Sequence, residues 1–187
     1  MRMRTAVRLG ALAPIVAGVL AASSTAWAAT AGDSEQVTKL LSEAKTMAFQ
    51  LKEDAAAMEG FTRMKVSWET NSAAINQIRD HVNALERQEA KLQEVKGEAS
   101  PWQRAAIDRI TPFLDELAGY TAAIIEHLNG DKKHTIDEYN DYLEANADYA
   151  SDLAAMIGDF VNYGVTKQRV ERLGAKLEVP VAKGASR

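Results

Sequence analysis

Apolar side chains recur at alternating steps of three and four residues through most of the chain after residue 32. This spacing places them along one side of an α-helix, and so predicts helices with a single buried stripe. Four helices are predicted in this way: 33–60, 68–97, 101–129, and a long one from Thr135 up to Pro180. The residues predicted to face inward are Val37, Leu40, Ala44, Met47, Leu51, Asp54 and Met58 in the first helix; Trp68, Asn71, Ile75, Ile78, Val82, Leu85, Glu89 and Leu92 in the second; Ile107, Ile110, Leu114, Leu117, Thr121, Ile124 and Leu128 in the third; and Tyr139, Leu143, Asn146, Ala150, Leu153, Ile157, Phe160 and Gly164 in the fourth.

Local signals mark where the helices begin and end. Asp33 is the predicted cap of the first helix, with Gln36 three residues later. The segment Ser100-Pro101-Trp102-Gln103 combines a serine cap, a proline at the first helical position and a glutamine that can close a capping box. Thr135-Ile136-Asp137-Glu138 is a second capping box, and Asn129-Gly130 is a stop signal. Pro112 lies inside the third helix and predicts a kink there.

Short connections between long helices favour antiparallel neighbours. We therefore predict an all-α domain over residues 29–179, an up-and-down antiparallel four-helix bundle with a long C-terminal helix. That last helix is longer than its partners, so it overhangs the bundle unless it bends near Gly158 or Gly164. Residues 180–187 are predicted to form a disordered tail.

The first 28 residues have the pattern of a cleavable signal peptide. Three arginines precede an apolar run from Leu9 to Ala22, and Ala26-Trp27-Ala28 places small residues where signal peptidase cleaves. An uncleaved anchor is the alternative, but the run is shorter than the roughly 20 residues of a spanning helix. Cleavage after Ala28 and export to the periplasm or the medium are predicted.

Composition narrows the possible functions. The chain carries 22 basic and 26 acidic residues, and removing residues 1–28 takes away three arginines and no acid, so the net charge moves from −4 to −7. An acidic chain is a poor partner for nucleic acid. The chain has no cysteine, which excludes thiolate metal sites, c-type haem attachment and a cysteine nucleophile.

Two groups of polar residues on the predicted stripes are candidates for pairing or binding. Glu89 lies level with Arg109 across the second and third helices, and a partly buried ion pair is predicted there. At one end of the bundle Asp54, Trp68, Asn71, His127 and Tyr139, with Glu138, are predicted to lie close together, where they are candidates for a ligand-binding site. The favoured interpretation is a solvated bundle end, where polar residues on a stripe cost little free energy. No metal or cofactor is predicted, because the Glu-x-x-His pairs of di-iron bundles are missing.

The end of the long helix has a different composition. Between residues 165 and 179, basic side chains alternate with apolar ones on a helical pattern. A basic amphipathic helix can bind a partner helix or an anionic membrane surface, and it can also fold back on its own bundle. The residues of this predicted interaction surface are Lys167, Arg169, Val170, Arg172, Leu173, Lys176 and Leu177.

The chain resembles a group of small exported bacterial helical-bundle proteins that has no assigned activity. The resemblance rests on Trp68-Glu69, on Ile75 to Val82-Asn83, and on Ser100-Pro101-Trp102-Gln103 through Pro112. It extends over most of residues 34–179 and implies a fold rather than a reaction.

No catalytic signature accompanies these features: there is no nucleophile elbow and no glycine-rich phosphate loop. We therefore expect a non-enzymatic interaction or structural protein of the cell envelope, which associates with itself or with another protein. A periplasmic carrier or sensor of a small ligand or metal is one alternative, and a holdase-like chaperone is another.

Overall fold

The computed structural model describes residues 32–130 and 137–178, which form four α-helices and no strand. The helices are α1 (Glu35–Gly60), α2 (Trp68–Glu94), α3 (Pro101–Gly130) and α4 (Asp137–Leu177). Two short 3-10 turns, η1 (Phe61–Arg63) and η2 (Lys96–Glu98), follow α1 and α2. The predicted signal peptide, the capping threonine at position 135 and the tail at 180–187 lie outside the described residues.

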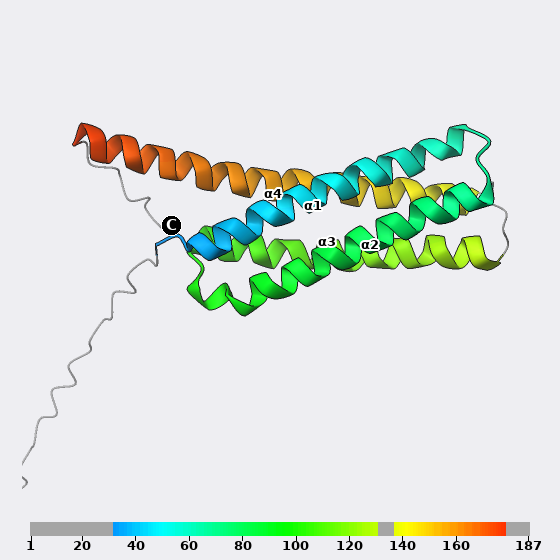
Figure 1. Ribbon diagram of the computed structural model, residues 1–187, viewed down its shortest axis with the longest axis horizontal. Helices are drawn as coiled ribbons and strands as arrows, with labels where there is room; N and C mark the ends of the chain where they lie inside the picture. The colour runs from blue at the N-terminus through cyan, green and yellow to red at the C-terminus, as the bar shows by residue number, and fades with distance from the viewer. Residues whose placement is uncertain (1–31, 131–136, 179–187) are drawn as a thin grey trace, which may run out of the picture.

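The four helices lie side by side and share one core (Figure 1). Both α1 and α3 pack against α2 and against α4, so α1 faces α3 across the core. The described part of the chain is therefore all-helical, as the hydrophobic pattern predicts. Helix α4 has 41 residues against 26 in α1, 27 in α2 and 30 in α3, and it extends past the ends of the others.

The core side of α1 differs from the predicted one by one row of residues. Leu41, Ala48 and Ala55 are buried, where the sequence pattern predicted Leu40, Met47 and Asp54. Leu40 and Met47 pack at the edge of the core instead. Both rows obey the same three-and-four spacing, so the pattern alone does not choose between them. The small side chains of Ala48 and Ala55 turn inward because they let α1 approach its neighbours closely.

The predicted ion pair between Glu89 and Arg109 is not formed in the described residues, and this prediction is wrong. Gln88, not Glu89, is the buried residue, and it donates hydrogen bonds to the carbonyl of Leu40 (3.0 Å) and to Glu43 Oε2 (2.9 Å). Glu89 accepts a hydrogen bond from the hydroxyl of Thr111 at 2.7 Å. A neutral amide loses less free energy on burial than a carboxylate, which favours the rotation of α2 that buries Gln88.

Ser34, rather than the predicted Asp33, caps α1, and its hydroxyl accepts a hydrogen bond from the Val37 amide. Helix α3 begins at Pro101, as predicted, and the Ser100 amide donates to Gln103 Oε1 at 2.9 Å, the glutamine half of the predicted capping box. The helix continues without a break through Pro112. Because proline has no N–H group, Pro112 leaves the carbonyl of Asp108 without its helical donor. Both residues lie on the exposed side of α3, where water can satisfy that carbonyl.

Gln103 joins the beginnings of α1 and α3. Its side chain is fully buried and makes four hydrogen bonds. Oε1 accepts from the amides of Ser34 (3.0 Å) and Ser100 (2.9 Å), while Nε2 donates to the Ser34 carbonyl and to Thr38 Oγ1, each at 2.9 Å. One glutamine thus provides the acceptor for the amides of Ser34 and Ser100 at two helix starts, and it adds a donor to the Ser34 carbonyl, which also accepts from the Thr38 amide.

Replacing Gln103 with Met keeps the approximate volume of the side chain and removes these four bonds. We expect Gln103→Met to lower the free energy of unfolding by about 2–4 kcal/mol, because several buried polar groups lose their partners. Chemical denaturation measures this change. Gln93→Met, the same substitution at an exposed position of α2, is the control and should change it by less than about 0.5 kcal/mol. Equal effects at the two positions would contradict the role of Gln103.

Candidate functional site

Helix α4 leaves the bundle after Gly164, its last buried residue. We call residues 165–178 the projecting end. It extends beyond the starts of α1 and α3 and does not fold back on them (Figure 1). All seven residues of the predicted interaction surface lie on it. Its large apolar side chains are about half exposed or more: the exposed fraction is 57% for Val165, 47% for Val170, 48% for Leu173 and 65% for Leu177.

The last tight contact of α4 with the bundle is between Gly164 and the ring of Trp102. A Cβ atom at position 164 would lie 2.7 Å from Trp102 Cη2 and 2.9 Å from Cζ2, well inside van der Waals contact. Glycine is therefore required here for the outer atoms of the indole ring to approach the backbone of α4 this closely. Tyr163 packs against the same indole edge to face, with ring centroids 5.6 Å apart.

A polar network holds the same junction. Trp102 Nε1 donates to Asp33 Oδ1 at 2.7 Å, and Lys167 Nζ pairs with Asp33 Oδ2 at 2.8 Å. Lys167 also pairs with Glu171 at 3.1 Å, one turn further along the projecting end. In the described residues, Lys167 is the last side chain of α4 with a hydrogen bond or ion pair to another segment. The direction of the projecting end is thus fixed by an aromatic contact and an ion pair.

The electrostatics of this network are set by the burial of Asp33, whose side chain is only 9% exposed. Burial by itself raises the pKa of the Asp33 carboxyl, but hydrogen bonds from Lys167 and Trp102 outweigh it, so the pKa is lowered from 3.8. The hydrogen bond to Asp33 raises the pKa of Lys167 above 10.5, although burial acts against this. Both groups are therefore charged at neutral pH.

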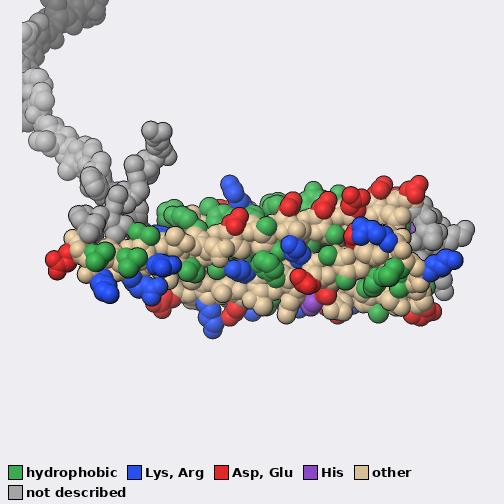
Figure 2. Space-filling model, turned by 90° about the horizontal axis from the view of Figure 1, so that it is seen from above, with side chains coloured by type: hydrophobic (Ala, Val, Ile, Leu, Met, Phe, Trp, Pro, Cys, Tyr) green, Lys and Arg blue, Asp and Glu red, His purple; other side chains and the backbone are tan. Residues whose placement is uncertain are grey.

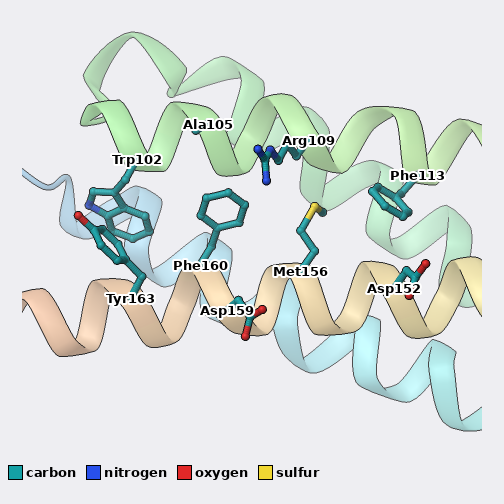
Figure 3. A pocket seen from close by; sticks show the side chains of 9 residues that line it. All are labelled: Trp102, Ala105, Arg109, Phe113, Asp152, Met156, Asp159, Phe160 and Tyr163. Atoms are coloured by element: carbon teal, nitrogen blue, oxygen red, sulfur yellow. The ribbon is translucent and has the colours of Figure 1, made fainter. Parts of the chain in front are cut away.

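Beside this junction, α3 and α4 border an open groove with a volume of about 610 Å³ (Figure 3). Aromatic and apolar side chains line most of it, and the guanidinium of Arg109 lies over the ring of Phe160, 5.8 Å from its centroid. Asp152 and Asp159 give its α4 rim a negative charge. The lining residues are Trp102, Ala105, Arg109 and Phe113 from α3, and Asp152, Met156, Asp159, Phe160 and Tyr163 from α4.

Four of the five residues of the predicted ligand site do lie close together at the other end of the bundle. Tyr139 donates to Asn71 Oδ1 (3.1 Å) and stacks on His127, with ring centroids 5.2 Å apart. Trp68 Nε1 donates to the carbonyl of Leu128 (2.9 Å), in the last turn of α3. Burial raises the pKa of Tyr139 to about 12, so its hydroxyl stays a neutral donor. These polar groups are used to join helix ends, which is a structural role.

Asp54, the fifth residue, does not join them, and its predicted position is wrong. Its carboxylate lies 2.7 Å from His81 Nδ1 and accepts from Gln77 Nε2 at 3.1 Å, one and a half to three turns along α2 from Asn71. The prediction took the connection between the first two helices as a symmetric hairpin. The 3-10 turn η1 continues the direction of α1 beyond Gly60, so the chain reverses later than predicted. Residues of α1 therefore lie level with residues further along α2 than the prediction assumed.

The junction of Asp33, Trp102 and Lys167 is not predicted as a unit by any sequence pattern. Asp33 and Trp102 are 69 residues apart, and Asp33 and Lys167 are 134 apart, so no local motif connects them. The groove was missed for a related reason. Its aromatic residues lie outside the predicted core stripes, apart from Phe160, and aromatic residues at such spacing are common on helices.

Charge separates the projecting end from the rest of α4. Residues 137–164 include seven acidic residues and no Lys or Arg, whereas residues 165–178 include four basic and two acidic ones. Figure 2 shows basic and apolar side chains gathered at that end. In the described residues no three His, Asp or Glu side chains are placed to hold a metal ion. None of the described helices combines the length and apolar character needed to span a membrane.

No protein-family model, curated protein or solved structure matches the chain. The resemblance to exported helical-bundle proteins stays a prediction.

The contact between Gly164 and Trp102 can be tested with a matched pair of glycines in α4. Gly164→Ala should lower the free energy of unfolding by about 1–3 kcal/mol, because the indole must move. Gly158→Ala should raise it by about 0.5–1 kcal/mol, since the nearest atom would be at 3.7 Å and alanine favours the helix. Denaturant titration measures both variants. A stabilised Gly164→Ala would contradict the required close approach.

The network at Asp33 predicts a dependence of stability on pH. Its folded pKa is below 3.8, so the stability that it contributes is present above pH 3.8 and is lost as the pH falls through the lowered pKa. Asp33→Asn should destabilise the protein at neutral pH, and the difference from the wild type should shrink between about pH 5 and pH 3. Thermal unfolding at several pH values measures this. Asp115→Asn, at an exposed site on α3, is the control, and a pH-independent difference for Asp33→Asn would refute the ion pair.

Proposed function

We propose that this chain is an exported, non-enzymatic helical protein of the cell envelope that binds a protein partner through the projecting end of α4. In this proposal residues 1–28 are the cleaved signal peptide, and residues 29–179 form a single up-and-down bundle. The observation that carries the proposal is the projecting end itself, a continuous helix with exposed Val170, Leu173 and Leu177 beside basic side chains.

The exposed apolar side chains of this helix favour a role in binding over a helix end without a function. Exposed leucine and valine on a helix that contacts nothing lose the free energy that burial would provide, about 1.5–3 kcal/mol for each side chain. An interface recovers it. The basic side chains Arg169, Arg172 and Lys176 surround these residues and would pair with an acidic partner surface, which adds specificity more than affinity.

The carrier alternative has less support from the geometry. Its candidate residues Trp68, Asn71 and Tyr139 donate and accept within the helix contacts described above. A ligand there would have to displace bonds that already hold the bundle end together. The chaperone alternative needs a broad exposed apolar surface. The exposed large hydrophobic residues gather on the projecting end, with Phe49, Met64 and Tyr163 elsewhere in the described part.

Photocrosslinking in the producing cell tests the proposal with the full chain. A benzophenone amino acid is placed at Leu173 in one variant and at Met64 in the other. Met64 is the matched control, because it is 61% exposed against 48% for Leu173 and lies at the opposite end of the bundle. We expect position 173 to give one defined adduct with a polypeptide, either a second copy of the chain or a different protein, and position 64 to give none. No adduct at 173, or the same adducts at both positions, would contradict the proposal.

A further inference from the structure

The exposed apolar stripe of the projecting end does not continue the core side of α4. At 100° per residue, the side that carries Ile157 and Gly164 into the core continues through Gln168, Glu171 and Ala175, which are polar or small. Val170, Leu173 and Leu177 lie roughly on the opposite side of the helix. These side chains would stay exposed even if α1 or α3 were longer, because those helices pack against the core side of α4. They need a partner on the outward side of α4.

The same outward side carries the acidic residues of α4 within the bundle. Asp148, Asp152 and Asp159 are exposed and lie in line with Val170 and Leu177 by helical spacing. The groove shown in Figure 3 opens along this side, with Met156 and Tyr163 in its wall. This side of α4 thus presents an acidic, partly aromatic half before Gly164 and an apolar half after it, and Arg169 and Lys176 flank the apolar half.

We propose that a second copy of the chain covers this surface, with the two α4 helices antiparallel and a two-fold axis near residues 164–165. This proposal rests on the proposed function and names its partner. In such a pair each basic projecting end lies along the acidic α4 rim of the groove of the other copy. The two-fold axis forms this contact twice, once from each copy. The self-complementary charge distribution favours this partner over an unrelated protein or an anionic membrane.

The lengths of the two halves agree with this arrangement. The groove occupies residues 152–163 of α4, about 16 Å along the helix, and the outward stripe of the projecting end occupies 170–177, about 10 Å, so the stripe is short enough to lie within the groove. An axis near residues 164–165 places Leu173 opposite Met156, and Arg169 and Lys176 opposite the segment 152–160. Leu173 then meets the groove wall at Met156. In the same register Val170 and Leu177 lie opposite Asp159 and Asp152, so Arg169 and Lys176, each one position before them, lie next to the two carboxylates of the groove rim.

Cysteine pairs test the orientation, because the chain has no cysteine of its own. The double variant Met156→Cys/Leu173→Cys should form a covalent dimer on mild oxidation, since each introduced thiol faces the other type in the second copy. The two positions are about 25 Å apart within one helix, so they cannot pair inside one chain. Each single variant should stay unlinked. A dimer from Leu173→Cys alone would indicate a parallel pair and would overturn the proposal.

Charge reversal tests the recognition. Light scattering and sedimentation of the full chain, purified from the producing cell, should show a dimer. Arg169→Glu/Lys176→Glu should raise the dimer dissociation constant at least tenfold, as should Asp152→Lys/Asp159→Lys, and combining all four should restore association. Lys65→Glu/Arg87→Glu changes the net charge as much as the first pair, at exposed sites of the bundle, and should leave the dimer unchanged.

A monomer at concentrations of tens of micromolar, or a dimer that neither reversal weakens, would overturn the proposal. Circular dichroism of each variant confirms that the helices remain folded. This failure is distinguishable from failure of the proposed function. A crosslink from position 173 to a different polypeptide would keep the proposed function and exclude the second copy as its partner, whereas no crosslink at 173 would remove both.

Discussion

The structure depends on how closely α1, α3 and α4 approach one another where α4 leaves the bundle. The buried amide of Gln103 makes this approach possible, because it satisfies the backbone of Ser34 and Ser100 without water. With these two helix starts joined, Trp102, one position before Gln103, is held against Gly164. A single glutamine therefore connects the capping of two helices to the placement of the fourth.

Much of the fold could be predicted from the sequence, because helical periodicity and capping are local. The four helices, the start at Pro101, and the inward positions of α3 followed from spacing and cap residues. Contacts between helices were less predictable. Two adjacent rows of apolar residues on α1 fit the same spacing, and only packing against α2 and α4 decides that Ala48 and Ala55 turn inward.

In the candidate site, too, local features could be predicted from the sequence and contacts between helices could not. The composition of the projecting end is a local property, so its basic and apolar residues could be identified in advance. Its separation from the core side follows from helical spacing as well, because the core positions of α4, Ile157 and Gly164 among them, are buried as predicted. The height matches that placed Asp54 beside Asn71 failed when the turn η1 lengthened the path of α1. Predicting the ion pair of Asp33 with Lys167 would have required knowing the helix packing first.

The projecting end is helical without its own core because it continues α4. An isolated segment of about 14 residues is marginally helical in water, since the first turn is costly to nucleate. Here the bundle provides the nucleus, and each further residue adds one hydrogen bond to a helix already formed. The pair of Lys167 with Glu171 supports the first turn beyond Gly164. A partner therefore meets an ordered surface, and association avoids most of the entropy loss of folding a binding segment. The bundle can thus be understood as a rigid support that presents one helix in a fixed direction.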